Sequence, residues 1–343
     1  MSVVPDRAAE EGQAMPAPRC PPGPSCLGIE GAWQVARIGG DGPDPPLCIF
    51  LHLWQNLLSK DQRPLPRPQG IEPTPCDRPV TPSSPSDPES LVQLANVLAD
   101  AARLHTVALF RTPLEVIAKL DESPVTVADR SAETAMRDLI NARHPSHGIL
   151  GEEHGRERMD AEFLWVLDPI DGTRSFITGS PLWGTLIALL HHGQPVLGLV
   201  DMPMLNERWV AWRGQGARCN GREVQASACR DLAQARIGTT SPDAFSPAEW
   251  AAFDDLSRRC AMRRFGGDCY GYAQLAGGYT DLIVEANLQP YDYLSVACLV
   301  QAAGGIMTDW NGDALGVASD GRVLAAATPE LHAQALAVLR APR

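Results

Sequence analysis

The sequence lacks the features that mark several large classes of protein. Basic charge is scarce, because 29 lysine and arginine residues stand against 41 acidic ones and the net charge is −12. This balance argues against binding to nucleic acid through bulk electrostatics. The nine cysteines form no Cys-x-x-Cys pair, so neither a disulfide framework nor a zinc site of regular spacing is indicated. No apolar run reaches the roughly 18 residues of a membrane span. We therefore expect a cytoplasmic protein with reduced cysteines, no membrane segment and no nucleic-acid partner.

Proline is concentrated at one end of the chain. Residues 1–88 hold 18 of the 30 prolines. A segment of this composition cannot bury enough apolar surface to offset the entropy of ordering, so it predicts a disordered, proline-rich extension. Three explanations stay open: a tail that binds proline-recognition domains, a targeting extension, or the product of an early start codon. We expect the last, or a non-functional tail, with the true start near Val80.

From residue 89 onward the sequence predicts ordered structure. Apolar residues recur at helical spacing from Leu91 to Phe110, and a second helix is expected from Thr126. Residues 185–212 predict antiparallel strands, and beyond residue 230 helix and strand patterns alternate, which indicates a layered α/β architecture. We divide the chain into the extension 1–88, an N-terminal α+β subdomain 89–229 with a metal site, and a C-terminal α/β subdomain 230–343 that completes the site.

A strand ends abruptly at the sequence Asp168-Pro-Ile-Asp-Gly-Thr173. Two carboxylates three residues apart at a strand end can converge on one hard cation, and oxygen ligands of this kind suit Mg²⁺. The backbone N–H groups of Gly172 and Thr173 at a following helix start would face an anion. The competing interpretation is a surface Asp-Pro turn followed by an Asp-Gly bend.

Further acidic residues occur in three other stretches. Asp129 and Glu133 share one helix face, Gly151-Glu-Glu-His-Gly155 forms a tight bend, and Asp292 begins a helix that runs into Ala302-Ala-Gly-Gly305. Each alone is ordinary, since a solvated first turn or a polar loop explains it equally well.

In their order and spacing these motifs resemble the inositol monophosphatase-like family of Mg²⁺-dependent, Li⁺-sensitive phosphatases. Gly-Glu-Glu and Asp-Pro-Ile-Asp-Gly-Thr are intact, whereas Tyr291-Asp292 replaces the family's Trp-Asp. Lys119-x-Asp121 and Ser123-Pro-Val-Thr126-x-x-Asp129 are similar to its N-terminal signature. The resemblance covers roughly residues 89–343 and implies the αβαβα sandwich of the sugar-phosphatase superfamily, two or three Mg²⁺ ions, a small phosphate monoester as substrate, and a homodimer.

The resemblance also implies roles for individual residues. Asp129, Thr173 and Glu152 would be catalytic, with Asp129 and Thr173 orienting and activating the attacking water. The residues expected to bind substrate are Gly172, Thr173, Asp268, Glu285 and Asp292. The expected metal ligands are Glu152, Asp168, the Ile170 carbonyl, Asp171 and Asp292.

Within the family, the sequence is most similar to the histidinol-phosphate phosphatases of histidine biosynthesis. The similarity rests on segments such as Thr173-Arg-Ser-Phe-Ile-Thr-Gly179 and Arg264-Phe-Gly-Gly-Asp-Cys-Tyr270. Asp268 and Glu285 would suit a cationic leaving group, although Asp268 could instead be a helix N-cap. Two alternatives stay open: the same chemistry on inositol 1-phosphate or another sugar or nucleotide phosphate, and a non-catalytic scaffold that binds metal or phosphate.

Overall fold

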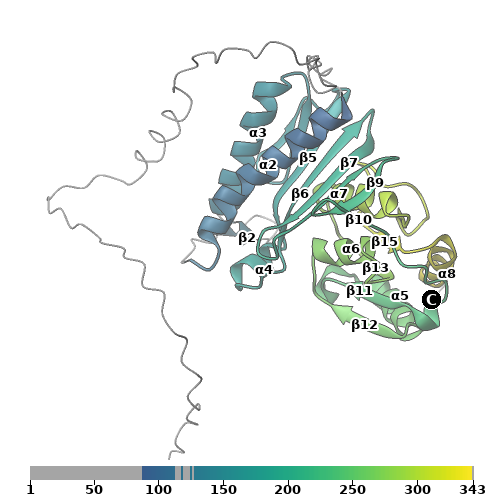
Figure 1. Ribbon diagram of the computed structural model, residues 1–343. Helices are drawn as coiled ribbons and strands as arrows, with labels where there is room; N and C mark the ends of the chain where they lie inside the picture. The colour runs from purple at the N-terminus through teal and green to yellow at the C-terminus, as the bar shows by residue number, and fades with distance from the viewer. Residues whose placement is uncertain (1–86, 113–116, 119–123, 126, 342–343) are drawn as a thin grey trace, which may run out of the picture. The chain divides into compact units, whose positions relative to one another are not determined.

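The computed structural model describes residues 87–112, 117–118, 124–125 and 127–341 (Figure 1). The expectations for the proline-rich extension, for Lys119 and for the helix start at Thr126 lie outside these residues. Among the described residues, no helix is both long and apolar enough to cross a membrane.

The larger of two main sheets has eight strands in the order β10-β9-β8-β7-β6-β5-β3-β4. Strands β3 and β5 are parallel and every other neighbouring pair is antiparallel, so the expected meander between residues 185 and 212 is confirmed. The strands are β3 (Gly148–Gly151), β4 (Gly155–Glu157), β5 (Phe163–Asp171), β6 (Gly184–His191), β7 (Gln194–Met202), β8 (Glu207–Trp212), β9 (Gly216–Cys219) and β10 (Arg222–Val224).

The smaller main sheet has five strands in the order β12-β11-β13-β15-β14. Both neighbours of β11 are parallel to it, whereas β15 is antiparallel to β13 and β14. The expected boundary at residue 229 falls between the two sheets. The strands are β11 (Arg236–Thr239), β12 (Met262–Phe265), β13 (Leu282–Glu285), β14 (Ile306–Thr308) and β15 (Val323–Ala326), and a separate pair joins β1 (Ile117–Ala118) to β2 (Pro124–Val125).

Helices cover both sheets and fill the space between them (Figure 1). Three hydrophobic clusters define the layers: α2 and α3 against the large sheet, α6 and α7 between the sheets, and α5 and α8 against the outer face of the small sheet. The expected αβαβα sandwich is thereby confirmed. The helices are α2 (Pro88–Leu109), α3 (Val127–Arg143), α4 (Thr173–Ile177), α5 (Pro247–Arg258), α6 (Cys269–Ala276), α7 (Pro290–Ala302) and α8 (Pro329–Leu339), with short 3₁₀ turns η1 (Leu232–Gln234) and η2 (Pro242–Ala244).

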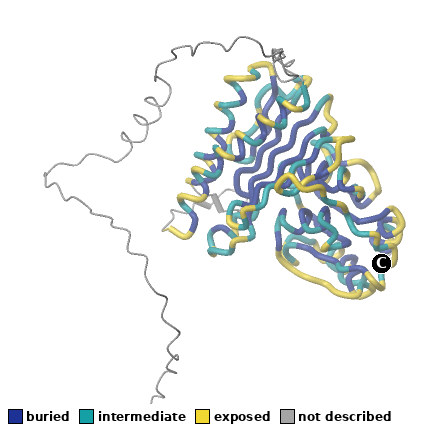
Figure 2. Tube along the Cα trace, viewed as in Figure 1, coloured by how far each residue is buried: buried dark blue, intermediate teal, exposed yellow. Residues whose placement is uncertain are grey.

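Strand alternation explains why each sheet has two buried faces. Trp165 and Leu167 of β5 belong to the cluster beneath α2 and α3, whereas Leu164 and Val166 belong to the cluster between the sheets. Figure 2 shows the central strands of the large sheet, β3, β5, β6 and β7, as an almost continuously buried layer. Helix α7 is buried over eight consecutive residues, Tyr293–Val300, as expected for a helix between two sheets.

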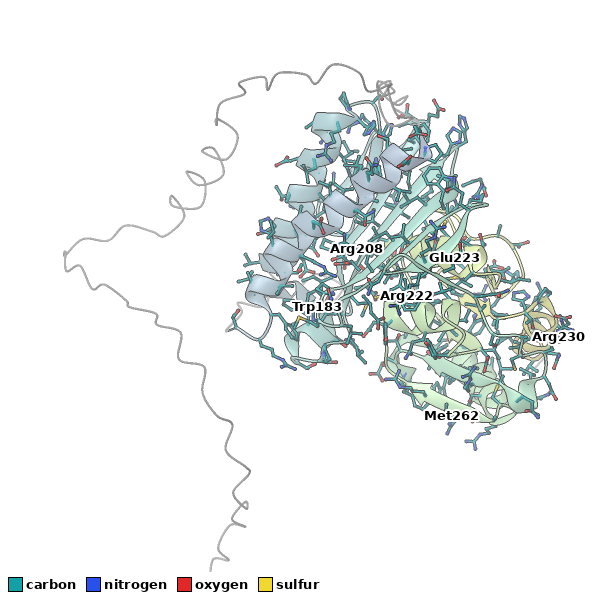
Figure 3. The ribbon with its side chains drawn as sticks, viewed as in Figure 1. Trp183, Arg208, Arg222, Glu223, Arg230 and Met262 are labelled. Atoms are coloured by element: carbon teal, nitrogen blue, oxygen red, sulfur yellow. The ribbon has the colours of Figure 1, made fainter. Side chains whose placement is uncertain are left out.

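One expectation about local structure is wrong, and one strand was not predicted. The predicted apolar stripe of the first helix includes Leu104 and Val107, yet their side chains are 76% and 43% exposed. Alanines such as Ala95, Ala99 and Ala102 line the buried face instead, because small side chains let α2 pack closely. In addition, β12 was not expected, because all four of its residues are exposed at the sheet edge and show no alternation (Met262 in Figure 3).

Candidate active site

An irregularity at the end of β5 brings two carboxylates together. Asp168 pairs with Leu186 of β6 and Asp171 pairs with Gly184, so β5 holds one residue more than β6 over this stretch. In a regular strand, side chains three residues apart point to opposite faces, and a bulge of one residue removes this difference. The Thr185 hydroxyl fixes the bulge by donating to the Pro169 carbonyl, at 2.8 Å.

A third carboxylate, Asp292 in the first turn of α7, completes a cluster. One oxygen each from Asp168, Asp171 and Asp292 lies within 4.8 Å of the others. Backbone N–H groups hold each side chain: Ile170 donates to Asp168 at 3.0 Å, Cys269 to Asp171 at 2.6 Å and Gln289 to Asp292 at 2.7 Å. The end of β5 and the first turn of α7 therefore lie side by side in the fold.

Burial and mutual repulsion shift the protonation of this cluster. Burial, followed by the charges of Glu152, Asp171, Asp292 and Asp129, raises the pKa of Asp168 well above its usual range. Burial and the charge of Asp268 raise the pKa of Asp171 to about 8, and burial and Asp171 raise the pKa of Asp292. Among the described residues, none of the largest contributions to these three shifts comes from a basic side chain, so a bound cation would help to hold the carboxylates charged at neutral pH. Clustered carboxylate oxygens fit Mg²⁺, a hard ion.

Glu133 of α3 holds the turn that carries Glu152. Its buried carboxylate accepts the N–H groups of Glu153 at 2.6 Å and His154 at 3.2 Å, and pairs with Arg137 at 2.7 Å. Gly151 permits this approach, since a Cβ there would lie 2.0 Å from the Glu133 carboxylate. Neither Asp129 nor Glu133 is solvated, because both are no more than 1% exposed. Glu133 thus supports the turn, whereas Asp129 lies close enough to raise the pKa of Asp168.

The turn after β5 places Thr173 beside the cluster. Gly172 has φ +83°, a left-handed conformation that glycine adopts readily, and α4 begins at the next residue. The Thr173 hydroxyl donates to the Ile170 carbonyl at 3.1 Å. Trp183 packs against Phe176 of α4 at a ring-centroid distance of 4.9 Å, which anchors this short helix (Figure 3).

Asp268 occupies the N-cap position of α6, but its side chain does not cap the helix. Its side chain makes no capping hydrogen bond and instead accepts the Ser175 hydroxyl at 2.9 Å. It also packs against Gly172, where a Cβ would lie 3.0 Å from the Asp268 carboxylate. Burial raises the pKa of Asp268, while the hydrogen bond from Ser175 and the charge of Arg174 lower it.

Glu285 lies at the end of β13 and is held by side chains from two other elements. It accepts the Thr240 N–H at 2.8 Å, the Thr240 hydroxyl, and the Tyr272 hydroxyl at 2.8 Å. A carboxylate offers about four acceptor positions, so these three donors leave room for a further donor. Burial raises the pKa of Glu285, against the effect of these hydrogen bonds.

A cavity of about 330 Å³ joins these groups. Asp171, Asp292 and Thr173 line it together with Asp268 and Glu285, so two further carboxylates share the cavity with members of the cluster. Arg174 also lines the cavity, whereas Arg264 donates to the Gly266 carbonyl outside it.

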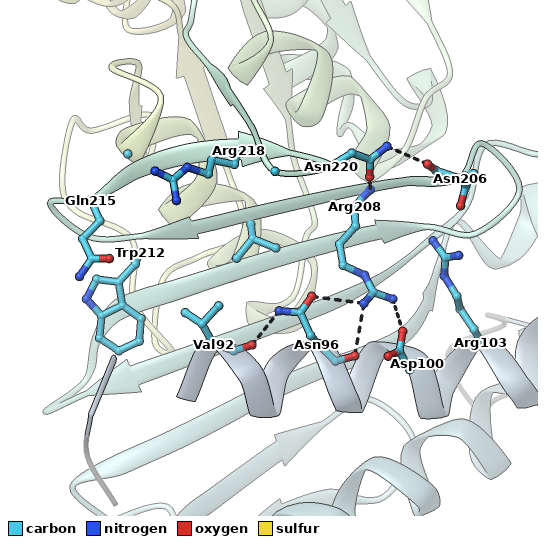
Figure 4. Close-up of a pocket in the computed structure, with 13 residues that line it drawn as sticks. Val92, Asn96, Asp100, Arg103, Asn206, Arg208, Trp212, Gln215, Arg218 and Asn220 are labelled. Atoms are coloured by element: carbon cyan, nitrogen blue, oxygen red, sulfur yellow. Dashed lines mark hydrogen bonds and ion pairs between the residues drawn. The ribbon is translucent and has the colours of Figure 1, made fainter. Parts of the chain in front are cut away.

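A larger cavity of about 540 Å³ lies between α2 and strands β8 and β9, away from the carboxylate cluster (Figure 4). Its arginines are engaged in ion pairs: Arg208 contacts Asp100 at 2.7 Å and the buried Asp201 at 2.8 Å, and Arg103 also pairs with Asp201. These contacts tie α2 to the large sheet.

The sequence did not reveal the residues that hold the predicted site residues in place by hydrogen bonds. Ser175 is 93 residues from Asp268, and Thr240 is 45 residues from Glu285. No local pattern links such pairs. Glu133 was noted only as a neighbour of Asp129 on one helix face.

Comparison with known proteins gives a consistent result. The family model described as the inositol monophosphatase family matches residues 87–342. The bifunctional phosphatase IMPL2, chloroplastic, of Arabidopsis thaliana is 43% identical over 267 residues, covering 75% of this chain and 77% of that protein. A histidinol-phosphatase of Chlorobaculum parvum is 39% identical over 223 residues, covering 64% of this chain and 86% of that protein.

A solved structure agrees with both sequence matches. The inositol monophosphatase from Zymomonas mobilis superposes with a TM-score of 0.68 at 42% identity, covering 74% of this chain and 98% of that one. Because the family model spans nearly all the described residues and the fold is shared, the chain belongs to the inositol monophosphatase family of phosphatases.

Proposed function

We propose that this protein is a Mg²⁺-dependent phosphomonoesterase that hydrolyses L-histidinol phosphate to L-histidinol and phosphate, a step of histidine biosynthesis. The observation that carries the substrate assignment is the pair Asp268 and Glu285, which line the same cavity as Asp171 and Asp292. Two carboxylates beyond the ion-binding cluster suit a leaving group that carries an ammonium and an imidazole. The histidinol-phosphatase of Chlorobaculum parvum supports this choice.

The proposed ion ligands are Glu152, Asp168, the Ile170 carbonyl, Asp171 and Asp292, for two or three Mg²⁺ ions. When bound, Mg²⁺ supplies positive charge that neutralises the clustered carboxylates and the substrate phosphate. Phosphoryl transfer depends mainly on such neutralisation and on in-line positioning, so no covalent nucleophile is needed.

The chain's own residues would position the reacting groups. The Thr173 hydroxyl donates a hydrogen bond to the Ile170 carbonyl. The lone pairs of the hydroxyl oxygen are then available to accept a hydrogen bond from the attacking water. Asp129 would orient the same water and accept its proton, with Glu152 close by. The N–H groups of Gly172 and Thr173 would hold the phosphate, and Asp268 and Glu285 would hold the leaving group.

Asp268→Asn tests the substrate assignment. Loss of a charge-assisted hydrogen bond costs about 1.5–3 kcal/mol, so kcat/KM for L-histidinol phosphate should fall about 10- to 100-fold. The rate with inositol 1-phosphate, which has no cation for Asp268 to bind, should change little. Asp138→Asn, which removes an exposed carboxylate on α3, is the matched control. An equal fall in kcat/KM with both substrates would contradict the substrate assignment but not the proposed phosphatase activity.

A second candidate is the same chemistry on inositol 1-phosphate or another sugar or nucleotide phosphate. The 42% identity to the Zymomonas mobilis inositol monophosphatase favours it. A third, a non-catalytic scaffold that binds metal or phosphate, is disfavoured because Thr173 and the carboxylates proposed as ligands are all present. Mg²⁺-dependent phosphate release from any of these esters would exclude the scaffold.

The proposal includes a homodimer in the cytoplasm that acts on a small molecule without nucleic acid or membrane partners. Analytical ultracentrifugation of the full chain tests the oligomeric state, and a monomer at micromolar concentration would contradict it. Fractionation of the host cell tests the location, and recovery in an organelle or membrane fraction would contradict it.

A further inference from the structure

Three metal-ligating side chains meet at the end of the large sheet where β5 begins and β6 ends. Glu162 precedes β5, His191 closes β6, and His192 follows it. One ligand atom from each lies within 4.8 Å of the others. The Glu162 carboxylate lies 2.9 Å from His191 Nε2 and 3.9 Å from His192 Nε2.

The backbone explains why two adjacent histidines face one carboxylate. Successive side chains of a strand point to opposite faces, so His191 and His192 would diverge in a regular strand. His192 instead has φ +49° and turns the chain toward β7, which brings the two imidazole rings to a centroid distance of 4.3 Å. The His192 N–H donates to the Glu162 carbonyl at 2.9 Å, which fixes the register of the turn.

Packed aromatic rings hold His191, whereas the side chains of His192 and Glu162 are open to solvent. His191 stacks on Phe163 at 4.5 Å, and Phe163 stacks on His147 at 4.9 Å, so packed rings orient the first imidazole. The side chains of His192 and Glu162 are 71% and 60% exposed. An ion can therefore reach the group from solvent, and His192 can adjust its ring.

The donor set differs in kind from the carboxylate cluster. Imidazole nitrogens with one carboxylate oxygen suit Zn²⁺, Ni²⁺ and Cu²⁺, whereas Mg²⁺ prefers oxygen alone. Zn²⁺ binds such ligands at about 2.0–2.2 Å, which requires ligand atoms about 3.4 Å apart, a value between the two distances from Glu162. Glu162 is six residues before Asp168, roughly 20 Å away along the strand.

We propose that Glu162, His191 and His192 form a second metal site, for a divalent transition-metal ion such as Zn²⁺. The three side chains supply three ligands, and water completes the coordination. A bound ion would link the beginning of β5 to the end of β6 and so stabilise this end of the sheet. The site is independent of the proposed Mg²⁺ centre at the other end of β5.

Calorimetric titration of the full chain with Zn²⁺, in saturating Mg²⁺, tests the site. Zn²⁺ binding elsewhere, including at the carboxylate cluster or at cysteines, is the same in every variant, so the comparison between variants isolates the site. His192→Ala and Glu162→Gln should each weaken one Zn²⁺ equivalent at least tenfold. His105→Ala, which removes a histidine of α2, should bind Zn²⁺ as the unaltered protein does.

Electron paramagnetic resonance of one Cu²⁺ equivalent gives an independent readout. The unaltered protein should show nitrogen couplings from two imidazoles, and His192→Ala should lose one of them. Melting curves confirm that each variant is folded. Identical Zn²⁺ stoichiometry and affinity in all variants, or a Cu²⁺ spectrum that His192→Ala leaves unchanged, would overturn the proposal.

Discussion

At the scale of single residues, Asp171 connects the proposed ion site to the cavity that we propose binds the substrate. It accepts the Cys269 N–H and shares the carboxylate cluster with Asp168 and Asp292. Asp171→Asn should lower phosphate release by more than about 100-fold, because an ion ligand is lost. The metal-free fold should survive, since asparagine can still accept the Cys269 N–H and no longer repels its neighbours. Normal turnover in this variant would refute the ligand assignment, and circular dichroism provides the control for folding.

The raised pKa of Asp171 predicts how stability depends on pH. Its pKa in the folded protein is about 8, against an ordinary value of 3.8. The stabilising contribution of the protonated group is therefore complete below about pH 4 and is lost as the pH rises toward 8. Mg²⁺ replaces the proton, so its effect on the melting temperature should be larger at pH 8.5 than at pH 6. An equal Mg²⁺ increment at both pH values would contradict the proposed site.

Ser175 is expected to tune Asp268 rather than to contact the reacting atoms. Its hydroxyl lowers the pKa of Asp268, so Ser175→Ala should raise that pKa further. The pH at which kcat/KM for L-histidinol phosphate reaches half its maximum should then move upward. The profile for inositol 1-phosphate serves as the control. A displacement of both profiles by the same amount would indicate a general structural effect.

At the scale of secondary-structure elements, α3 supports the ion site through Glu133. Glu133→Gln removes the charge that pairs with Arg137 and places an N–H donor where backbone N–H groups point. We expect the free energy of unfolding to fall by about 2–4 kcal/mol, with weaker Mg²⁺ binding because the turn carrying Glu152 loosens. Urea unfolding and Mg²⁺ titration measure the two effects. Asp138→Asn on the same helix is the control, and an equally small effect of both changes would contradict this role.

Elements also differ in how well the sequence predicted them. The bulge in β5 brings together two aspartates that the Asp-Pro-Ile-Asp motif had already identified, because proline and glycine mark the end of a strand locally. The buried face of α2 was predicted poorly, since hydrophobicity favours Leu104 over the alanines that pack against the sheet. An edge strand such as β12 has no buried face and therefore no alternation to detect.

At the scale of the whole molecule, alternating helix and strand patterns beyond residue 230 indicated a layered α/β architecture, whereas the αβαβα order of the layers was predicted from the family resemblance. That Asp292 joins Asp168 and Asp171 was predictable only from the resemblance between motifs. Contacts such as Ser175 with Asp268, or Thr240 with Glu285, depend on how the two sheets pack around α6 and α7. Such packing cannot be predicted from short stretches of a single sequence.

The central claim is that the cavity beside the carboxylate cluster hydrolyses a cationic phosphate monoester. Phosphate release by the full chain, from L-histidinol phosphate and from inositol 1-phosphate at equal concentration, with and without Mg²⁺, tests it most directly. We predict release that requires Mg²⁺ and strongly favours L-histidinol phosphate. A preference for inositol 1-phosphate, or release from L-histidinol phosphate that persists after Mg²⁺ is removed, would contradict the claim.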